Sequence, residues 1–216
     1  MLKNNMINFV QNFAYLVILV KKLLMSEENL VNNIKNKDLN SFKVLVDEYQ
    51  KKVLNTCNRF VNNREDAEDL TQEVFIEVYR SISGFRGDSK LSTWIYRIAV
   101  TKSLDFLRKR KRKKRFGIMK SISSEEKLRE ELKATDISNP GTQAENQDRI
   151  KILNEALEKL PENQRVAFTL SKYDELSYQE IAEILETTIP AVESLIHRAK
   201  NNLKKRLYNY YEKKLI

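Results

Sequence analysis

Residues that interrupt regular structure are scarce in this chain of 216 residues, which has only four glycines and three prolines. Tight hairpins depend on such residues, so their scarcity, together with 32% charged residues, predicts an all-α protein. The single cysteine, Cys57, excludes an internal disulfide and fits a reducing cytoplasm. With one histidine besides, His197, no zinc site is expected, because zinc normally takes three or four such ligands.

A long apolar run is also missing. The longest apolar segment, residues 13–20 (FAYLVILV), is too short to span a bilayer, which needs about 20 apolar residues. No cleavage site of a signal peptide follows it. Three interpretations of residues 1–25 stay open: an extension ahead of a true start at Met25, a docking helix, or a membrane-surface anchor.

Acidic residues are in the minority, since 39 lysines and arginines against 30 aspartates and glutamates give a formal charge of +9. Such a balance favours an acidic partner. Eight consecutive basic residues, 108–115, end a stretch that begins at Lys90 and contains the only tryptophan, Trp94. Aromatic rings beside cations can hold unstacked bases, although core packing is the alternative for each ring. Nucleic acid is therefore the predicted partner of this stretch, and nothing in it indicates a catalytic group or a cofactor.

The residues before this stretch predict helices with one buried face. Apolar residues recur at helical spacing between residues 27 and 62, and Cys57 lies on that stripe, which predicts a buried structural thiol. Asn62 and Asn63 offer a cap for a helix whose apolar stripe is Ala67, Leu70, Val74, Val78 and Ile82. A second face of that helix carries Asp66, Asp69, Glu73 and Glu77. This acidic face is either simply solvated or a dock for a basic protein surface.

Two segments are predicted to lack regular structure. Residues 83–89 contain two of the four glycines, which predicts a loop. Residues 116–148 contain a proline–glycine pair and an acidic balance, which predicts a mobile linker with one short helix at residues 125–133. The sequence therefore predicts two small helical domains, over residues 26–115 and 149–216.

The second domain carries the pattern of a helix-turn-helix. Ser177 and Glu180 form a capping box for a short helix over residues 178–185, and a turn at residues 186–189 leads into a long helix with Pro190 in its first turn. The apolar stripe of that helix is Val192, Leu195, Ile196, Ala199, Leu203 and Leu207. Its outer face carries the donors and acceptors that a major groove requires, namely Glu193, Ser194, His197, Arg198, Lys200, Asn201, Lys204 and Lys205.

These motifs resemble those of a known family. The sequence DAEDLTQEVFIEVY, followed by FRGDSKLSTWIYRIA and by D-x-L-R at residues 105–108, resembles the second conserved region of sigma factors. The sequence LPENQRVAFTLSKYDELSYQEIAEILETTIPAVESLIHRAKNNL resembles the fourth. The absence of other regions between them is typical of the compact extracytoplasmic-function (ECF) subfamily of the sigma-70 family. The resemblance covers residues 40–115 and 150–207.

The resemblance implies a role for each motif. It implies that the acidic helix binds the coiled coil of the largest catalytic subunit of RNA polymerase, through Asp66, Asp69, Gln72 and Glu73. It implies that the next loop and helix recognise and melt the −10 promoter element, through Phe85, Arg86, Lys90, Trp94, Arg97, Thr101, Lys102 and Arg108. It implies that the helix-turn-helix reads the −35 element as duplex, through Ser177, Tyr178, Gln179, Pro190, Ala191, Glu193, Ser194, His197, Arg198, Lys200, Lys204 and Lys205. The linker resembles the segment near the RNA exit path. Thr101 departs from the family pattern, in which many members have asparagine, and the basic run after Arg108 is unusually long.

The implied partners are the RNA polymerase core, including the flap of its other large subunit, promoter DNA and an anti-sigma factor. No small-molecule substrate, no cofactor and no catalysis are implied. The implied location is the cytoplasm, on the nucleoid when active, with an anti-sigma factor as the link to the membrane. Two alternatives stay open: a stand-alone helix-turn-helix regulator, and a nuclease in which Asp66, Asp69 and Glu73 would hold metal ions.

Overall fold

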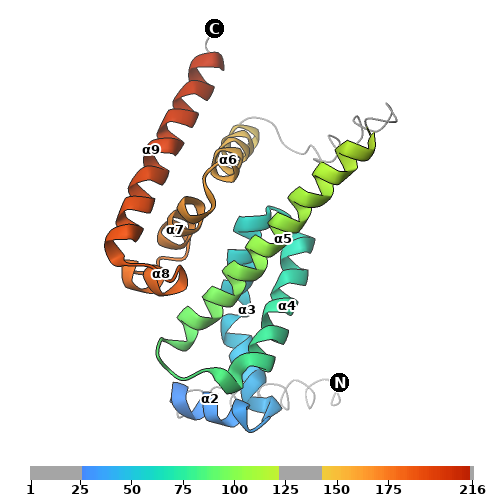
Figure 1. Cartoon of the computed structure of the whole chain (residues 1–216), viewed down its shortest axis with the longest axis vertical. Helices are drawn as coiled ribbons and strands as arrows, with labels where there is room; N and C mark the ends of the chain where they lie inside the picture. The colour runs from blue at the N-terminus through green and yellow to red at the C-terminus, as the bar shows by residue number, and fades with distance from the viewer. Residues whose placement is uncertain (1–25, 122–142, 215–216) are drawn as a thin grey trace, which may run out of the picture.

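The computed structural model describes residues 26–121 and 143–214, and every regular element in those ranges is a helix. The N-terminal unit consists of α2 (Glu27–Lys35), α3 (Leu39–Val61), α4 (Arg64–Ser81), the short 3₁₀ helix η1 (Ile82–Gly84) and α5 (Leu91–Ser121). The C-terminal unit consists of α6 (Gln143–Glu158), α7 (Glu162–Tyr173), α8 (Tyr178–Ile184) and α9 (Ile189–Lys214) (Figure 1). The predicted all-α class with two helical units is confirmed. Across these two ranges, no helix has the length and apolar character needed to cross a membrane.

The apolar stripe predicted between residues 27 and 62 is divided between two helices. Ser26 caps α2 and Asp38 caps α3, each by accepting hydrogen bonds from backbone N–H groups of the first turn. Between them, Lys37 takes a φ of 65°, which turns the chain. Asn62 (φ 53°) ends α3 in the left-handed conformation, and Asn63 caps α4 as predicted. Periodicity alone misses the break at Lys37 because the apolar spacing resumes after it.

Helices α2 to α5 enclose a first apolar core. Leu45, Val53 and Cys57 of α3 meet Leu91 and Ile95 of α5 there. Burying side chains of this size contributes about 1.5–3 kcal/mol each for the larger aliphatic residues. Cys57 is fully buried, which confirms the predicted buried thiol, and this burial raises the pKa of the thiol. The apolar stripe predicted for α4 faces this core, with exposures of 3% or less at Ala67, Leu70, Val74, Val78 and Ile82.

Helix α5 is buried on two sides and joins the two units. While Leu91 and Ile95 face the first core, Tyr96 and Val100 lie with Phe60 of α3 in a second cluster. Figure 1 shows α5 crossing the molecule between α3 and α4 on one side and the C-terminal helices on the other. Tyr96 is 6% exposed, so this ring packs in the core, and its burial raises the pKa of Tyr96 to about 12. The C-terminal unit supplies the rest of the second cluster: Val166, Ala167, Leu170, Ile181, Ala182, Ile184, Val192 and Ile196.

The C-terminal unit contains the predicted helix-turn-helix. The capping box of Ser177 and Glu180 is present at the start of α8, and Glu186 (φ 51°) lies in the turn to α9. Pro161 occupies the cap position of α7. A third cluster, with Leu157 and Leu160 among its members, packs α6 against α9. The predicted inward stripe of α9 is buried or partly buried at Val192, Leu195, Ile196, Ala199, Leu203 and Leu207.

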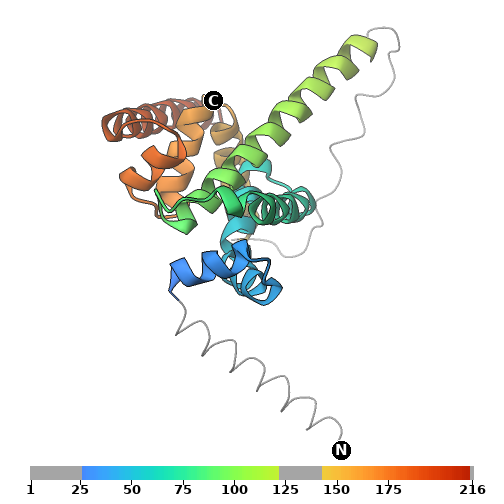
Figure 2. The same ribbon diagram turned by 60° about the horizontal axis from the view of Figure 1, so that its bottom comes forward.

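The helices extend into both ends of the range predicted as a linker. Helix α5 continues to Ser121 and α6 begins at Gln143, whereas residues 116–148 were predicted to connect the domains. The C-terminal end of α5 reaches beyond the other helices (Figure 2). The short helix predicted at residues 125–133 and the apolar extension at residues 1–25 lie outside the described residues.

Candidate nucleic-acid interface

The residues predicted to contact duplex DNA form one exposed surface on α8 and α9. The Ser177 hydroxyl forms the capping box: it donates to Glu180 Oε2 at 2.8 Å and accepts from the Glu180 N–H at 3.2 Å. It therefore positions the start of α8. On α9, the His197 ring and the Asn201 amide lie 2.9 Å apart, from Nε2 to Nδ2. Ala191 is partly exposed, and the remaining residues are exposed: Tyr178, Gln179, Pro190, Glu193, Ser194, His197, Arg198, Lys200, Lys204 and Lys205.

The first cations predicted for the −10 element face the C-terminal unit. Lys90 Nζ lies 2.9 Å from Glu180 Oε1, and Arg97 Nη1 lies 3.3 Å from Glu186 Oε1. Arg97 also donates to the backbone carbonyl of Glu183. The hydrogen bond from Lys90, reinforced by Ser177, lowers the pKa of Glu180 to about 2. These cations are thus neutralised by carboxylates of the helix-turn-helix.

The other predicted cations are paired as well. Arg108 forms an ion pair with Glu162 of α7 and a second, at 3.0 Å, with Asp105 of its own helix. Lys102 lies on another face of α5 and pairs with Glu77 of α4 at 3.1 Å. Arg86 in the preceding loop pairs with Asp88 at 3.0 Å, and both side chains are largely exposed. Thr101 is exposed on α5.

The two aromatic residues predicted for the −10 element contact each other. The rings of Phe85 and Trp94 are 5.1 Å apart at an angle of 45°. Phe85 is buried, and its carbonyl accepts a hydrogen bond from Lys35 Nζ at 2.7 Å. Trp94 is partly exposed and packs on the first core. The buried Phe85 ring therefore supports the Trp94 ring, and Trp94 retains exposed surface.

A polar hollow of ≈ 460 Å³ lies between α2 and the loop before α5. Glu27 accepts a hydrogen bond from the N–H of Leu91 at 2.9 Å and so anchors the start of α5. Gly87 takes a φ of 81°, which a residue with a side chain adopts only under strain. Several lining residues carry side chains that can donate or accept hydrogen bonds to a ligand. The lining residues are Glu27, Glu28, Val31, Asn32, Lys35, Phe85, Arg86, Gly87 and Ser89. Sequence reasoning missed Glu27 and Lys35, because their partners lie 64 and 50 residues away.

The acidic face of α4 is accessible. Asp69, Gln72 and Glu73 are exposed, while Asp66 is partly exposed and lies 3.7 Å from Arg110 of α5. Ile76, half exposed, continues this face and was not anticipated, because it belongs to neither stripe seen in the sequence. Within the described ranges, no group of three or more histidine, cysteine or acidic side chains is placed to hold a metal ion.

A buried ion pair joins the two units away from these surfaces. Asp174, at the end of α7, has a side chain that is 3% exposed and lies 2.5 Å from Arg59 Nη1 of α3. The Thr56 hydroxyl donates to the same carboxylate oxygen at 2.9 Å. Loss of hydration raises the pKa of Asp174, and the two hydrogen bonds oppose that shift. Beside it, the buried Arg165 donates to the backbone carbonyls of Arg59 and Phe60.

Comparisons with known proteins match both units. A family profile described as Sigma-70 region 2 matches residues 45–113, and one described as Sigma-70, region 4 matches residues 150–203. The RNA polymerase sigma-H factor of Pseudomonas aeruginosa is 34% identical over 197 residues, covering 84% of this chain and 93% of that protein. The ECF RNA polymerase sigma-E factor of Escherichia coli K12 is 35% identical over 176 residues, covering 82% and 91%.

Solved structures show the same fold. The structure of CnrH in complex with the cytosolic domain of CnrY covers 85% of this chain and 97% of its own, with a TM-score of 0.61 and 19% identity. The structure of the sigma factor RpoE with the anti-sigma factor NepR from Bartonella quintana covers 77% and 96%, with a TM-score of 0.56 and 22% identity. These likenesses support the helical architecture of both units.

Proposed function

Because this chain belongs to the ECF subfamily of the sigma-70 family, we propose that it binds core RNA polymerase and directs promoter recognition, duplex opening and transcription initiation. The observation that carries the proposal is the presence of two distinct exposed surfaces on one chain. An acidic face lies on α4, and a basic, polar face lies on α9. A stand-alone regulator needs only the second of these.

The acidic face of α4 is proposed as the dock for the coiled coil of the largest polymerase subunit. Asp69, Gln72 and Glu73 are exposed along one side of the helix, and Ile76 adds an apolar contact beside them. Complementary charge would set the orientation and speed of association, while the apolar residue adds buried area. Asp66 would join this contact after leaving Arg110.

The loop before α5 and the first half of α5 are proposed to hold the melted −10 element. Trp94, supported by Phe85, offers a surface for stacking, and the hollow beside Arg86 and Gly87 can accept an extruded base. Unstacking a base costs a few kcal/mol, and stacking on an aromatic ring returns about 1–3 kcal/mol. Lys90 and Arg97 would exchange the carboxylates of the C-terminal unit for DNA phosphates, so promoter binding would favour separation of that unit from α5.

The surface of α8 and α9 is proposed to read the −35 element in the major groove. The buried stripe of α9 fixes the helix on the C-terminal unit, so its outer face can enter a groove as a rigid element. Glu193 and Arg198 would contact base edges, whereas Lys204 and Lys205 would contact phosphates. The protein would supply no catalysis of its own.

An anti-sigma factor is a further proposed partner, and the proposed location is the cytoplasm. The RpoE structure with the anti-sigma factor NepR supports the idea by fold likeness. In this chain, carboxylates of the C-terminal unit already pair with Lys90, Arg97 and Arg108. A partner that holds the two units together would therefore keep the −10 site closed.

Reversing the charge of the docking face tests the proposal. Asp69→Lys combined with Glu73→Lys should abolish binding to core polymerase and specific transcript starts on a supercoiled promoter, with the helical circular dichroism unchanged. Both side chains are exposed, so the fold does not depend on them. Asp47→Lys with Glu155→Lys gives the same charge change at exposed positions elsewhere and should leave core binding intact. Unchanged core affinity in the first variant would refute the docking surface.

The stand-alone regulator remains the competing function. It would be favoured if core polymerase did not associate with the wild-type protein while the isolated protein bound one operator tightly. Specific starts that require both core polymerase and this protein would favour the sigma factor.

A further inference from the structure

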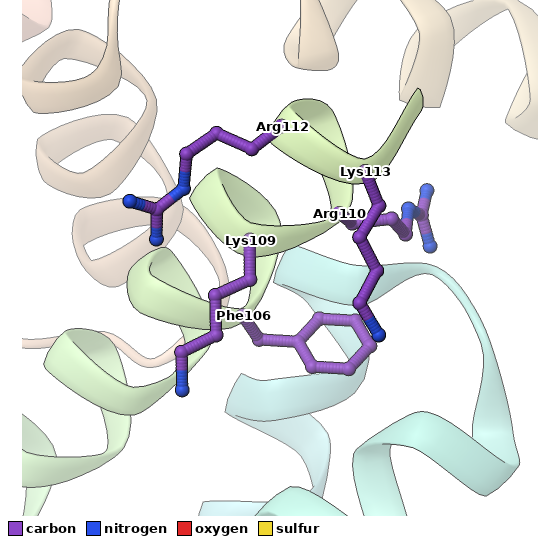
Figure 3. Close-up of a pocket in the computed structure, with 5 residues that line it drawn as sticks. All are labelled: Phe106, Lys109, Arg110, Arg112 and Lys113. Carbon is purple, nitrogen blue, oxygen red and sulfur yellow. The ribbon is translucent and has the colours of Figure 1, made fainter. Parts of the chain in front are cut away.

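The last described side chains of α5 form a cationic end that the proposed −10 site does not use. It consists of Lys109, Arg110, Arg112 and Lys113 around the ring of Phe106. These five residues line an open hollow of ≈ 680 Å³. Figure 3 shows Lys113 extending toward the Phe106 ring and Lys109 extending away from it, while Arg110 and Arg112 point to opposite sides of the helix. Phe106 itself packs partly against the first core, so the floor of the hollow is fixed.

The cationic end differs from the rest of α5 in the pairing of its charges. The earlier cations of the helix, Arg97, Lys102 and Arg108, and Lys90 just before it each have a carboxylate partner. Within the described side chains, Lys109, Arg112 and Lys113 have no ion pair, and Arg110 has only the 3.7 Å contact to Asp66. The cationic end therefore presents unneutralised charge even while the C-terminal unit lies against α5.

The shape of this surface favours a polyanion that can lie along the helix. Successive residues of an α-helix are 100° apart, so consecutive cations project in all directions, as Arg110 and Arg112 do in Figure 3. From Arg97 to Lys113 the helix rises about 24 Å, at about 1.5 Å per residue. Phosphates along a DNA strand are spaced about 3.4 Å apart, so this distance corresponds to about seven base pairs. Because the first half of α5 is assigned to the −10 element, its far end would reach neighbouring duplex.

We infer that the cationic end binds the phosphate backbone of duplex DNA between the −10 and −35 elements, without regard to base sequence. The position of that contact rests on the proposed function, whereas the affinity for duplex DNA does not. The Phe106 ring and the lysine stems offer an apolar floor for the sugar edge, and the cations neutralise the phosphates on either side. The contact is available before the two units separate, so it anchors DNA beside the closed −10 site.

The salt dependence of binding by the free protein tests the affinity directly. The variant Lys109→Gln/Arg112→Gln/Lys113→Gln removes three exposed charges and is compared with the wild type on a 30-base-pair duplex of random sequence across a potassium chloride series. Each phosphate contact contributes about −0.9 to the slope of log K against log salt, so the wild-type slope should be steeper by about 2.7. The control Lys51→Gln/Lys159→Gln/Lys172→Gln has the same charge change at exposed positions off α5 and should keep the wild-type slope.

Three outcomes would overturn the inference. The first is an equal slope in the wild type and the α5 variant, and the second is an equal loss in the control. The third is tighter binding of the wild type, but not of the α5 variant, to poly-glutamate than to duplex at the same salt, which would assign the surface to an acidic protein. Circular dichroism of both variants confirms that the helices are intact.

A footprint of the assembled complex tests the position. Hydroxyl-radical cleavage of a promoter bound by core polymerase and wild-type protein should show protection of the backbone between the two elements. The α5 variant should lose this protection while it keeps protection at both elements. Unchanged protection between the elements would refute the position. If the wild type fails to engage core polymerase while the salt slopes still differ, the proposed function fails and the duplex affinity stands.

Discussion

Arg59→Met should weaken the packing between the two units by removing one half of a buried ion pair. The Asp174 carboxylate is 3% exposed and faces Arg59 at 2.5 Å. Without Arg59, one hydrogen bond from Thr56 remains, and Asp174 Oδ2 has no hydrogen-bond partner among the described residues even in the wild type. Methionine keeps an unbranched apolar stem beside Tyr173, so the change is mainly one of charge.

The expected loss follows from the burial of the carboxylate. Removing one partner of a buried ion pair costs about 3–5 kcal/mol, because the other charge stays desolvated. Arg59 is 30% exposed, so water can replace part of its contact, and we expect a loss of about 3 kcal/mol, at the lower end of the range. Adding Asp174→Leu should recover most of it, since no buried charge then remains. Thr56 still donates to the carbonyl of Lys52 at 3.0 Å in that double variant.

Urea unfolding followed by circular dichroism measures this loss, and its pH dependence has a defined sign. Burial raises the pKa of Asp174, so the folded protein binds this proton more tightly than the unfolded chain. The contribution of this carboxyl to stability is therefore present below its unfolded pKa and is lost as the pH rises through the folded value. The penalty of Arg59→Met should be smaller at pH 4.5 than at pH 7, because protonation removes the unpaired charge.

Two results would refute this reasoning. One is an unfolding free energy within about 0.5 kcal/mol of the wild type at pH 7, which would mean that the pair behaves as an exposed one. The other is an equal penalty at pH 7 and pH 4.5. A pair of fluorophores, one on each unit, should report a larger mean separation in the single variant than in the double variant.

Four further variants have defined outcomes. Lys204→Gln with Lys205→Gln should weaken duplex binding across all sequences and reduce the salt slope by about 1.8, measured by fluorescence anisotropy. Arg198→Ala should instead cost about 1–3 kcal/mol at one base position, and a uniform loss over all sequences would contradict base reading. Gly87→Ala should cost about 1–2 kcal/mol in thermal unfolding through its φ of 81°, since the added methyl would have no described atom within 4 Å outside residues 86–88. Ser177→Ala should cost about 1 kcal/mol through loss of the cap, with Ser83→Ala as an exposed control.

Features with a local cause were predictable from the sequence. The capping box of Ser177 and Glu180, the cap at Asn63 and the buried stripes of α4 and α9 depend on residues within a few turns of one another. Spacing therefore carries enough information to place them. The break between α2 and α3 has a local cause as well, the Asp38 cap, but the continuing apolar spacing hides it.

Features that depend on distant contacts were not predictable. Arg59 and Asp174 are 115 residues apart, and Lys90 and Glu180 are 90 apart, so no local pattern signals either pair. For the same reason, the basic residues of α5 predicted a polyanion without showing that Arg97, Lys102 and Arg108 already have carboxylate partners. The position of Tyr96 in the second apolar cluster could not be predicted, because a helix that is buried on two sides has no single apolar stripe.

The cluster that Phe60, Tyr96 and Val100 share with the C-terminal helices has a consequence for a divided chain. If the backbone were cut between α5 and α6, each fragment would keep a core of its own and expose one half of this cluster. The exposed apolar halves would attract each other in water. Fragments expressed separately should therefore reassociate without a covalent link, and the Arg59–Asp174 pair would set their register. The contact between the two units could therefore also hold two separate polypeptides together as a complex.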